Sequence, residues 1–216
     1  MATQLHSVSC RSTIALPWPR FRPDQWAIAS HPAKVKVLSA GRRWGKTVLG
    51  GACCLATASV GGRVAWVVPE FKNGRPLWRM IKAAIGNGVK AGEIRSREDE
   101  RLVEFKGSGG FLGIYSCDNP DAMRGEAFNL LVMDEAARVK PDVWSEVLQA
   151  TLADVDGDAI LISTPKGKNW FWQEWTRGQA KTGEIASWQE PSRANPNPNI
   201  QAAAEKARER LPERVY

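Results

Sequence analysis

The residues of this chain that are best suited to chemistry form a loop ending in Gly45, Lys46 and Thr47. The loop reads AGRRWGKT from Ala40 onward. It matches the phosphate-binding pattern G-x-x-x-x-G-K-[ST], except that Ala40 replaces the first glycine. In such loops backbone amides surround phosphates, the lysine reaches the β- and γ-phosphates, and the hydroxyl binds Mg²⁺. We therefore expect Lys46 and Thr47 to bind a nucleotide with Mg²⁺; the alternative is a chance GKT at a helix start.

Two acidic residues, Asp134 and Glu135, directly follow the apolar run of residues 130–133. An apolar strand that runs into acids places them at the edge of a sheet. There Asp134 can bind Mg²⁺, directly or through water, and Glu135 can orient or deprotonate an attacking water molecule. Paired acids also occur as helix N-cap signals. Their combination with the GKT loop favours catalysis over capping.

Three further groups are less specific when each is taken alone. Ser163, Thr164 and Pro165 end an apolar strand, where the hydroxyls can sense a γ-phosphate or simply form a turn. Arg124 lies on an expected loop, where arginines are usually solvated. Gln25, within FRPDQW, can read the edge of an adenine or be a surface glutamine between core aromatics.

These residues need a scaffold of strands and helices, and the two alternate along the chain. Apolar or alternating runs predict strands at residues 35–40, 63–69, 101–105, 111–115, 128–133 and 159–163. The run at 159–163 is expected to be the last strand of the chain. Helices are expected at residues 46–59, 77–85, 141–150 and 201–210. This alternation predicts an α/β fold with a mostly parallel sheet. Gly50 and Gly51 lower helix propensity, which predicts close packing of their helix against the sheet.

Size, charge and cysteine content narrow the functional classes. The 216 residues can form one substantial domain with a small appendage, and the net charge of +7 suits a polyanionic partner. The four cysteines include no CxxC pair, which argues against a zinc site. No apolar run approaches the ~20 residues of a membrane span. We therefore expect a protein that stays inside the cell and has no membrane partner.

Taken together and in this order, the motifs resemble the ATPase domain of the large terminase subunit, the DNA-packaging motor of tailed bacteriophages. The resemblance rests on FRPDQW, SAGRRWGKT, AWVVPEF, DAMRGEAFNLLVMDEAA and ISTPKGKNWF. That family carries an arginine in a P-loop that departs from the general pattern, as Ala40 and Arg42 do here. The resemblance implies a P-loop NTPase of the ASCE or RecA-like type. It implies an N-terminal arm at 1–20, an ATPase core at 21–165 and a small lid subdomain at 166–216.

The resemblance also implies roles for single residues. Gln25 would recognise adenine, and the ATP site would comprise Gln25, Gly41, Arg42, Arg43, Trp44, Gly45, Lys46, Thr47 and Val48. The catalytic residues would be Arg42, Lys46, Arg124 and Glu135, with Arg124 acting on a neighbouring subunit's nucleotide. Mg²⁺ would be bound by Thr47 and Asp134. Ser163, Thr164 and Pro165 would couple hydrolysis to movement.

At the level of the whole protein, the resemblance implies ATP hydrolysis that drives double-stranded DNA into a procapsid. The partners would be DNA, further copies in a pentameric ring, the portal protein and the small terminase subunit. The site of action would be the bacterial host cytoplasm and, transiently, the procapsid. Acids after Pro165 are scattered, so the RNase H-like nuclease domain of full-length relatives is expected to be absent, and with it DNA cleavage.

Two alternatives share some of these motifs. A helicase-like DNA-dependent ATPase would need a second RecA-like domain, for which 216 residues leave no room. An ATP-binding assembly or regulatory protein with little turnover would not need the water-orienting acid Glu135.

Overall fold

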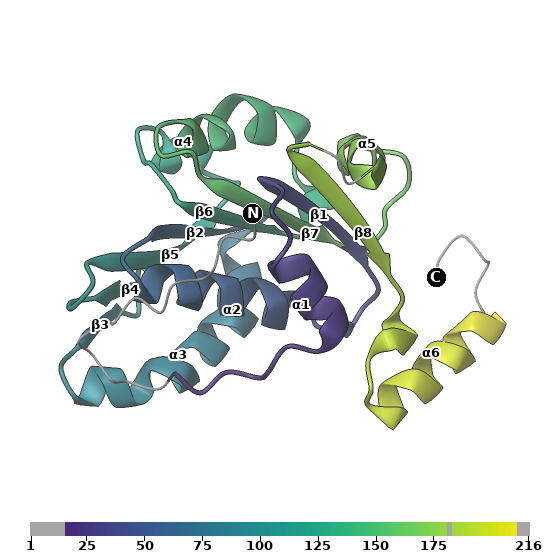
Figure 1. Cartoon of the computed structure of the whole chain (residues 1–216), viewed down its shortest axis with the longest axis horizontal. Helices are drawn as coiled ribbons and strands as arrows, with labels where there is room; N and C mark the ends of the chain where they lie inside the picture. Colours follow the sequence, from purple (N-terminus) through teal and green to yellow (C-terminus); the bar gives the residue numbers. More distant parts are fainter. Residues whose placement is uncertain (1–15, 181–182, 211–216) are drawn as a thin grey trace.

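An eight-stranded sheet runs through the computed structural model, which describes residues 16–180 and 183–210 (Figure 1). The strand order is β3-β4-β5-β2-β6-β7-β1-β8. Neighbouring strands are parallel along the part β5-β2-β6-β7-β1-β8 of this order. The pairs β3-β4 and β4-β5 are antiparallel. The strands are β1 (Val35–Ala40), β2 (Arg63–Val68), β3 (Ile94–Arg97), β4 (Leu102–Phe105), β5 (Gly110–Ser116), β6 (Leu130–Asp134), β7 (Asp158–Ser163) and β8 (Ile185–Glu190). The predicted α/β fold is confirmed.

Alternation of side chains along each strand divides the core into two layers. In β2, Val64, Trp66 and Val68 face one layer, and Ala65 and Val67 face the other; all five are fully buried. Figure 1 shows α1, α2 and α3 on one side of the sheet and α4 and α5 on the other. The helices are α1 (Pro23–Ala29), α2 (Lys46–Ser59), α3 (Arg75–Lys90), α4 (Ala150–Ala153), α5 (Trp170–Arg177) and α6 (Pro198–Arg210).

Helix α2 begins and ends as predicted, and its backbone lies close to the sheet at Gly50. A Cβ atom on Gly50 would lie 2.7 Å from the Trp66 ring and 3.0 Å from Val132 Cγ1. The prediction of close packing is therefore confirmed for Gly50. Gly51 faces Trp18 and Leu77 instead, which a Cβ atom would approach within 2.6 and 2.7 Å. Its small size admits the N-terminal segment and α3.

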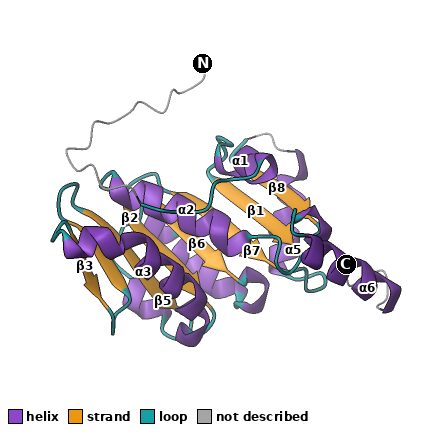
Figure 2. Ribbon diagram, turned by 90° about the horizontal axis from the view of Figure 1, so that it is seen from below, coloured by secondary structure: helices purple, strands orange, loops and turns teal. Residues whose placement is uncertain are grey.

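Strand β8 was not expected, and the prediction that the strand ending at Ser163 is the last one is wrong. β8 pairs with β1 along its whole length, from Val35 opposite Ile185 to Ala40 opposite Glu190. Part of the segment expected as a lid therefore belongs to the sheet. The remainder continues through a short 3₁₀ turn, Ser192–Ala194, into α6, which lies at the periphery (Figures 1 and 2). A separate lid stays a prediction.

Two other parts also differ from expectation. The stretch expected as one helix at 141–150 forms a π-helical segment, Val143–Leu148, followed by α4. Helix α1 was also missed; the Gln25 side chain accepts a hydrogen bond from the Arg22 amide at its start (3.1 Å). Of the arm expected at 1–20, residues 1–15 lie outside the described residues, and Trp18 donates a hydrogen bond to the Val48 carbonyl (3.0 Å). Among the described helices, none has the length and apolar character to cross a membrane.

Candidate functional site

The carboxyl ends of β1, β2, β6 and β7 meet at one edge of the sheet, because these strands run parallel. A cavity of about 560 Å³ opens at this edge. Six of the predicted site residues line it: Arg42, Thr47, Asp134, Glu135, Thr164 and Pro165. The topology thus brings together groups from three motifs that are far apart in the sequence.

The loop between β1 and α2 has the backbone conformation of a tight turn. Gly45 has a φ angle of 111°, which favours glycine, and Arg43 has a φ of 62°, which is uncommon for a residue with a side chain. The turn ends at Lys46, the first residue of α2, so the amino end of the helix faces the cavity edge. The positive end of a helix dipole and the free amides of a first turn favour an anion at such a position.

The Lys46 ammonium group is folded back onto its own loop. Its Nζ atom donates to the carbonyls of Ala40 (2.7 Å) and Gly41 (3.1 Å) and to Thr164 Oγ1 (3.3 Å). Burial lowers the pKa of Lys46, and the charges of Glu135 and Asp134 oppose that effect. A phosphate group would give this buried cation a close counter-charge, and Lys46 already connects the loop to the end of β7.

Asp134 and Glu135 differ in their surroundings. Burial and the neighbouring Glu135 charge raise the pKa of Asp134 to about 6. Asp134 Oδ1 accepts a hydrogen bond from the Glu135 amide (2.9 Å). Glu135 itself has a φ angle of 52°, a left-handed conformation that non-glycine residues adopt mainly where surrounding structure enforces it. The backbone therefore turns sharply between the two acids.

Thr47 and Asp134 each carry a side-chain oxygen of the kind that Mg²⁺ takes as a ligand. Both residues line the cavity, and Mg²⁺ in nucleotide sites takes one or two protein oxygens together with phosphates and water. Within residues 16–180 and 183–210, no group of three or more His, Cys, Asp or Glu side chains is placed to hold a metal ion. An ion here would thus depend on the phosphates of a nucleotide for part of its coordination.

Ser163 connects the end of β7 to the segment after the acids. It is fully buried; its Oγ atom accepts a hydrogen bond from the Ala137 amide (3.2 Å) and donates to the Thr164 carbonyl (3.2 Å). Thr164 in turn lies beside Lys46 (3.3 Å). The predicted coupling residues are therefore joined to both the P-loop and the acid-bearing segment.

Gln25 and Trp44 support the loop from the other side. Gln25 is only 2% exposed, and its Nε2 atom lies 3.4 Å from the Gly45 carbonyl. The Trp44 ring is fully buried, with the Arg22 guanidinium 4.9 Å from its centroid. Trp44 can therefore offer only its backbone to a nucleotide. Val48, in the first turn of α2, is partly buried. The adenine contact of Gln25 stays a prediction.

Arg124 lies apart from this cavity. It follows a 3₁₀ turn, Pro120–Met123, between β5 and β6. Its side chain is 60% exposed and pairs with Asp121 (2.5 Å). The cavity of a single copy of the chain therefore does not include Arg124.

Some site residues were missed by sequence reasoning. Asn73, Arg138 and Lys166 also line the cavity, and Asn195 donates a hydrogen bond to the Arg43 carbonyl (2.7 Å). The cations Arg138 and Lys166 stand three residues after Glu135 and directly after Pro165, so proximity to the motifs was an available signal. No signal of that kind exists for Asn195, which is 152 positions from Arg43.

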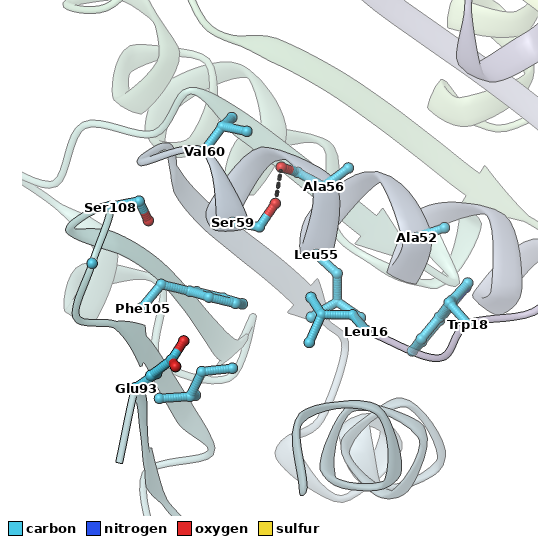
Figure 3. A pocket seen from close by; sticks show the side chains of 12 residues that line it. Leu16, Trp18, Ala52, Leu55, Ala56, Ser59, Val60, Glu93, Phe105 and Ser108 are labelled. Carbon is cyan, nitrogen blue, oxygen red and sulfur yellow. Dashed lines mark hydrogen bonds between the residues drawn. The ribbon is translucent and has the colours of Figure 1, made fainter. Parts of the chain in front are cut away.

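A second cavity, of about 380 Å³, lies away from these groups, between α2 and β4 (Figure 3). Leu16, Leu55 and Phe105 contribute to its lining, and Glu93 is the only acid among the described residues that line it. None of the motif residues belongs to this lining.

Comparison with known proteins finds relatives in sequence and in fold. No protein-family model matches the chain. It is 43% identical over 75 residues to the large terminase subunit of Thermus phage G20c, a match covering 35% of this chain and 14% of that protein. It is 30% identical over 112 residues to the large terminase subunit of Escherichia phage T5, covering 50% and 25%. The matched stretches are thus a small part of these relatives.

Solved structures share the fold. The large terminase ATPase domain of Thermus phage P74-26 superposes with a TM-score of 0.74 at 22% identity, over 90% of each chain. The large terminase of another thermophilic bacteriophage, in complex with ADP, superposes with a TM-score of 0.65 at 16% identity, over 90% of this chain and 51% of that one. The resemblance to the ATPase domain of large terminase subunits is confirmed.

Proposed function

Since the chain resembles large terminase ATPase domains in sequence and fold, we propose that it hydrolyses ATP to move double-stranded DNA into a viral procapsid. One observation carries the catalytic part of this proposal. A single cavity is lined by the loop arginine Arg42, the hydroxyl of Thr47 and the two acids Asp134 and Glu135. These are the groups needed to hold phosphates, a metal ion and an attacking water.

In the proposed reaction, the loop amides and Lys46 hold the β- and γ-phosphates. Lys46 gives up its hydrogen bonds to the Ala40 and Gly41 carbonyls in exchange for phosphate oxygens. Thr47 and Asp134 hold Mg²⁺, which neutralises charge on the phosphates when bound. Glu135 accepts a hydrogen bond from the attacking water and orients it towards the γ-phosphorus. Arg42 stabilises charge on the transferred group.

The same proposal assigns movement and assembly. Thr164 contacts Lys46 (3.3 Å). Loss of the γ-phosphate would move Lys46, and this movement would reach Ser163, Thr164 and Pro165. Arg124 would reach the nucleotide of the next copy in a pentameric ring, which suits its exposed position. The ring would stand on the portal protein with the small terminase subunit, in the bacterial host cytoplasm. DNA would be held mainly through its phosphates, so binding would weaken with salt.

Release of phosphate from ATP, measured with and without DNA, tests the catalytic assignment. Glu135→Gln should lower turnover by about 10²- to 10⁴-fold while ATP still binds. Lys46→Ala should lose ATP binding itself. Glu146→Gln is a matched control, because Glu146 is exposed on the π-helical segment Val143–Leu148 and lines neither cavity. This variant should keep wild-type turnover. Near wild-type turnover of Glu135→Gln would exclude the assignment.

A further inference from the structure

The segment that follows β8 crosses over the P-loop. The pairing of β1 with β8 extends one residue past the end of β1, since the Gly41 amide donates to the carbonyl of Glu190, the last residue of β8 (2.9 Å). A Cβ atom on Gly41 would lie 2.2 Å from Ser192 Oγ and 2.7 Å from the Ser192 amide nitrogen. Only glycine at position 41 leaves room for this crossing. The close approach brings the next residues within reach of the loop.

Asn195 makes the direct polar link between the two segments. Its Nδ2 atom donates to the Arg43 carbonyl (2.7 Å). Its Oδ1 atom accepts from the Asn197 amide (2.9 Å), and Asn197 Oδ1 accepts from the Asn199 amide (2.9 Å) at the start of α6. Both ends of the Asn195 amide are thus engaged, and hydrogen bonds run from the loop to the first turn of α6.

The carbonyl that Asn195 binds belongs to Arg43, the loop residue with a side chain and a left-handed backbone conformation. Arg43 has a φ of 62°, a conformation that residues with a side chain adopt when neighbouring structure holds it. In a trans peptide the carbonyl and the following amide point in opposite directions. Holding the Arg43 carbonyl against Asn195 therefore also fixes the direction of the Trp44 amide, which donates to the Gly41 carbonyl within the loop (3.4 Å).

We propose that Asn195 is a positioning residue for nucleotide binding, which keeps the P-loop in its phosphate-binding shape from outside the loop. This role of Asn195 rests on the proposed function, because it assumes that the loop binds ATP. Asn195 touches the loop backbone and lines neither cavity, so it acts through Arg43 and does not touch the nucleotide. Because coupling between two sites is reciprocal, bound nucleotide should in turn stabilise the link to α6.

The test replaces the donor with a group of the same size that cannot donate. Asn195→Asp places a carboxylate against the Arg43 carbonyl, and Asn195→Ala removes the group without adding charge. Asn199→Asp is the matched control, because it makes the same chemical change in α6 and Asn199 is exposed. Affinity for ATP is measured by calorimetry, turnover by phosphate release, and thermal unfolding without nucleotide serves as the stability readout.

We expect Asn195→Asp to weaken ATP binding about tenfold, the effect of losing a hydrogen bond and gaining a repulsion. The KM should rise more than kcat falls, and the unfolding midpoint without nucleotide should match that of Asn199→Asp. Wild-type affinity for ATP in a folded Asn195→Asp protein would overturn the role of Asn195 and leave the proposed function standing. Unfolding of both Asn195 variants would overturn it in favour of a purely structural role. If the folded wild-type protein binds no ATP, the proposed function fails as well.

Discussion

At the scale of single residues, Asp134 differs from an ordinary surface aspartate because its ionised form is disfavoured. Burial and the Glu135 charge raise its pKa to about 6, while an unfolded chain has an aspartate pKa of about 3.9. The folded protein therefore binds the proton more tightly. Its stability falls as the pH rises through the window between these two values, and the loss is complete above about pH 6.

Replacing Asp134 by asparagine should remove this loss. In the absence of nucleotide and Mg²⁺, we expect Asp134→Asn to be more stable than wild type at pH 7, by at most about 3 kcal/mol. At pH 4 the two should have nearly equal stability, because the wild-type carboxyl is then protonated in the folded state. Urea unfolding at both pH values measures the difference. An equal gain at pH 4 and pH 7 would contradict the assigned pKa.

Six of the residues that line the cavity beside the P-loop could be predicted from the sequence, because their motifs lie at or shortly after the carboxyl ends of apolar strands. Thr47, Asp134 and Thr164 meet because the carboxyl ends of parallel strands share an edge. Asn195 could not be predicted, because nothing local to the Asn-Pro turn indicates which part of the chain it contacts. Likewise, the sequence shows that Trp44 belongs to the loop but not that its ring is buried in the core.

At the scale of elements, two helical glycines should respond in opposite ways to the same substitution. A Cβ atom on Gly50 of α2 would lie 2.7 Å from the Trp66 ring, whereas one on Gly86 of α3 would have no atom within 4 Å. Gly86→Ala should stabilise the protein by about 0.5–1 kcal/mol through helix propensity. Gly50→Ala should destabilise it by about 1–3 kcal/mol through overpacking.

Thermal or urea unfolding of the two variants measures both effects, and each variant serves as the control for the other. Stabilisation by Gly50→Ala would show that α2 can move away from the sheet without cost. Since the same helix carries Lys46 and Thr47 at its first turn, such a shift would also be seen as a change in ATP affinity.

The elements differ in how well the sequence predicts them. β1 and α2 have the predicted bounds, because an apolar run, a glycine-bounded turn and a run of small residues mark them clearly. β8, with the sequence IASWQE, was missed because its burial is confined to Ala186 and Ser187 and its partner is β1. A strand with so little apolar pattern is defined by its tertiary neighbour.

At the scale of the whole molecule, the exposed position of Arg124 makes a prediction about assembly. Arg124→Ala and Glu135→Ala should each lose most ATP turnover, the first because it cannot serve a neighbour and the second because it cannot orient water. Mixing the two variants should restore part of the turnover, since Arg124 of a Glu135→Ala copy can complete the intact site of an Arg124→Ala copy. Phosphate release against mixing ratio is the measurement.

A mixture no more active than its components, under conditions where wild type is active and associates, would place Arg124 outside the reaction between copies. Substitution of Asp121, which pairs with Arg124, offers a milder control. Asp121→Asn frees the guanidinium group without removing it, so turnover should be kept.

The position of β1 between β7 and β8 also has a consequence for how the protein folds. Both neighbours of the P-loop strand come late in the chain: Lys46 contacts Thr164 across 118 positions, and Arg43 contacts Asn195 across 152. Contacts that close such long loops form slowly, and proteins dominated by them fold slowly. During synthesis the P-loop is made before these partners, and it lacks them until residue 195 has emerged from the ribosome. ATP binding by a nascent chain would therefore report that its sheet is complete.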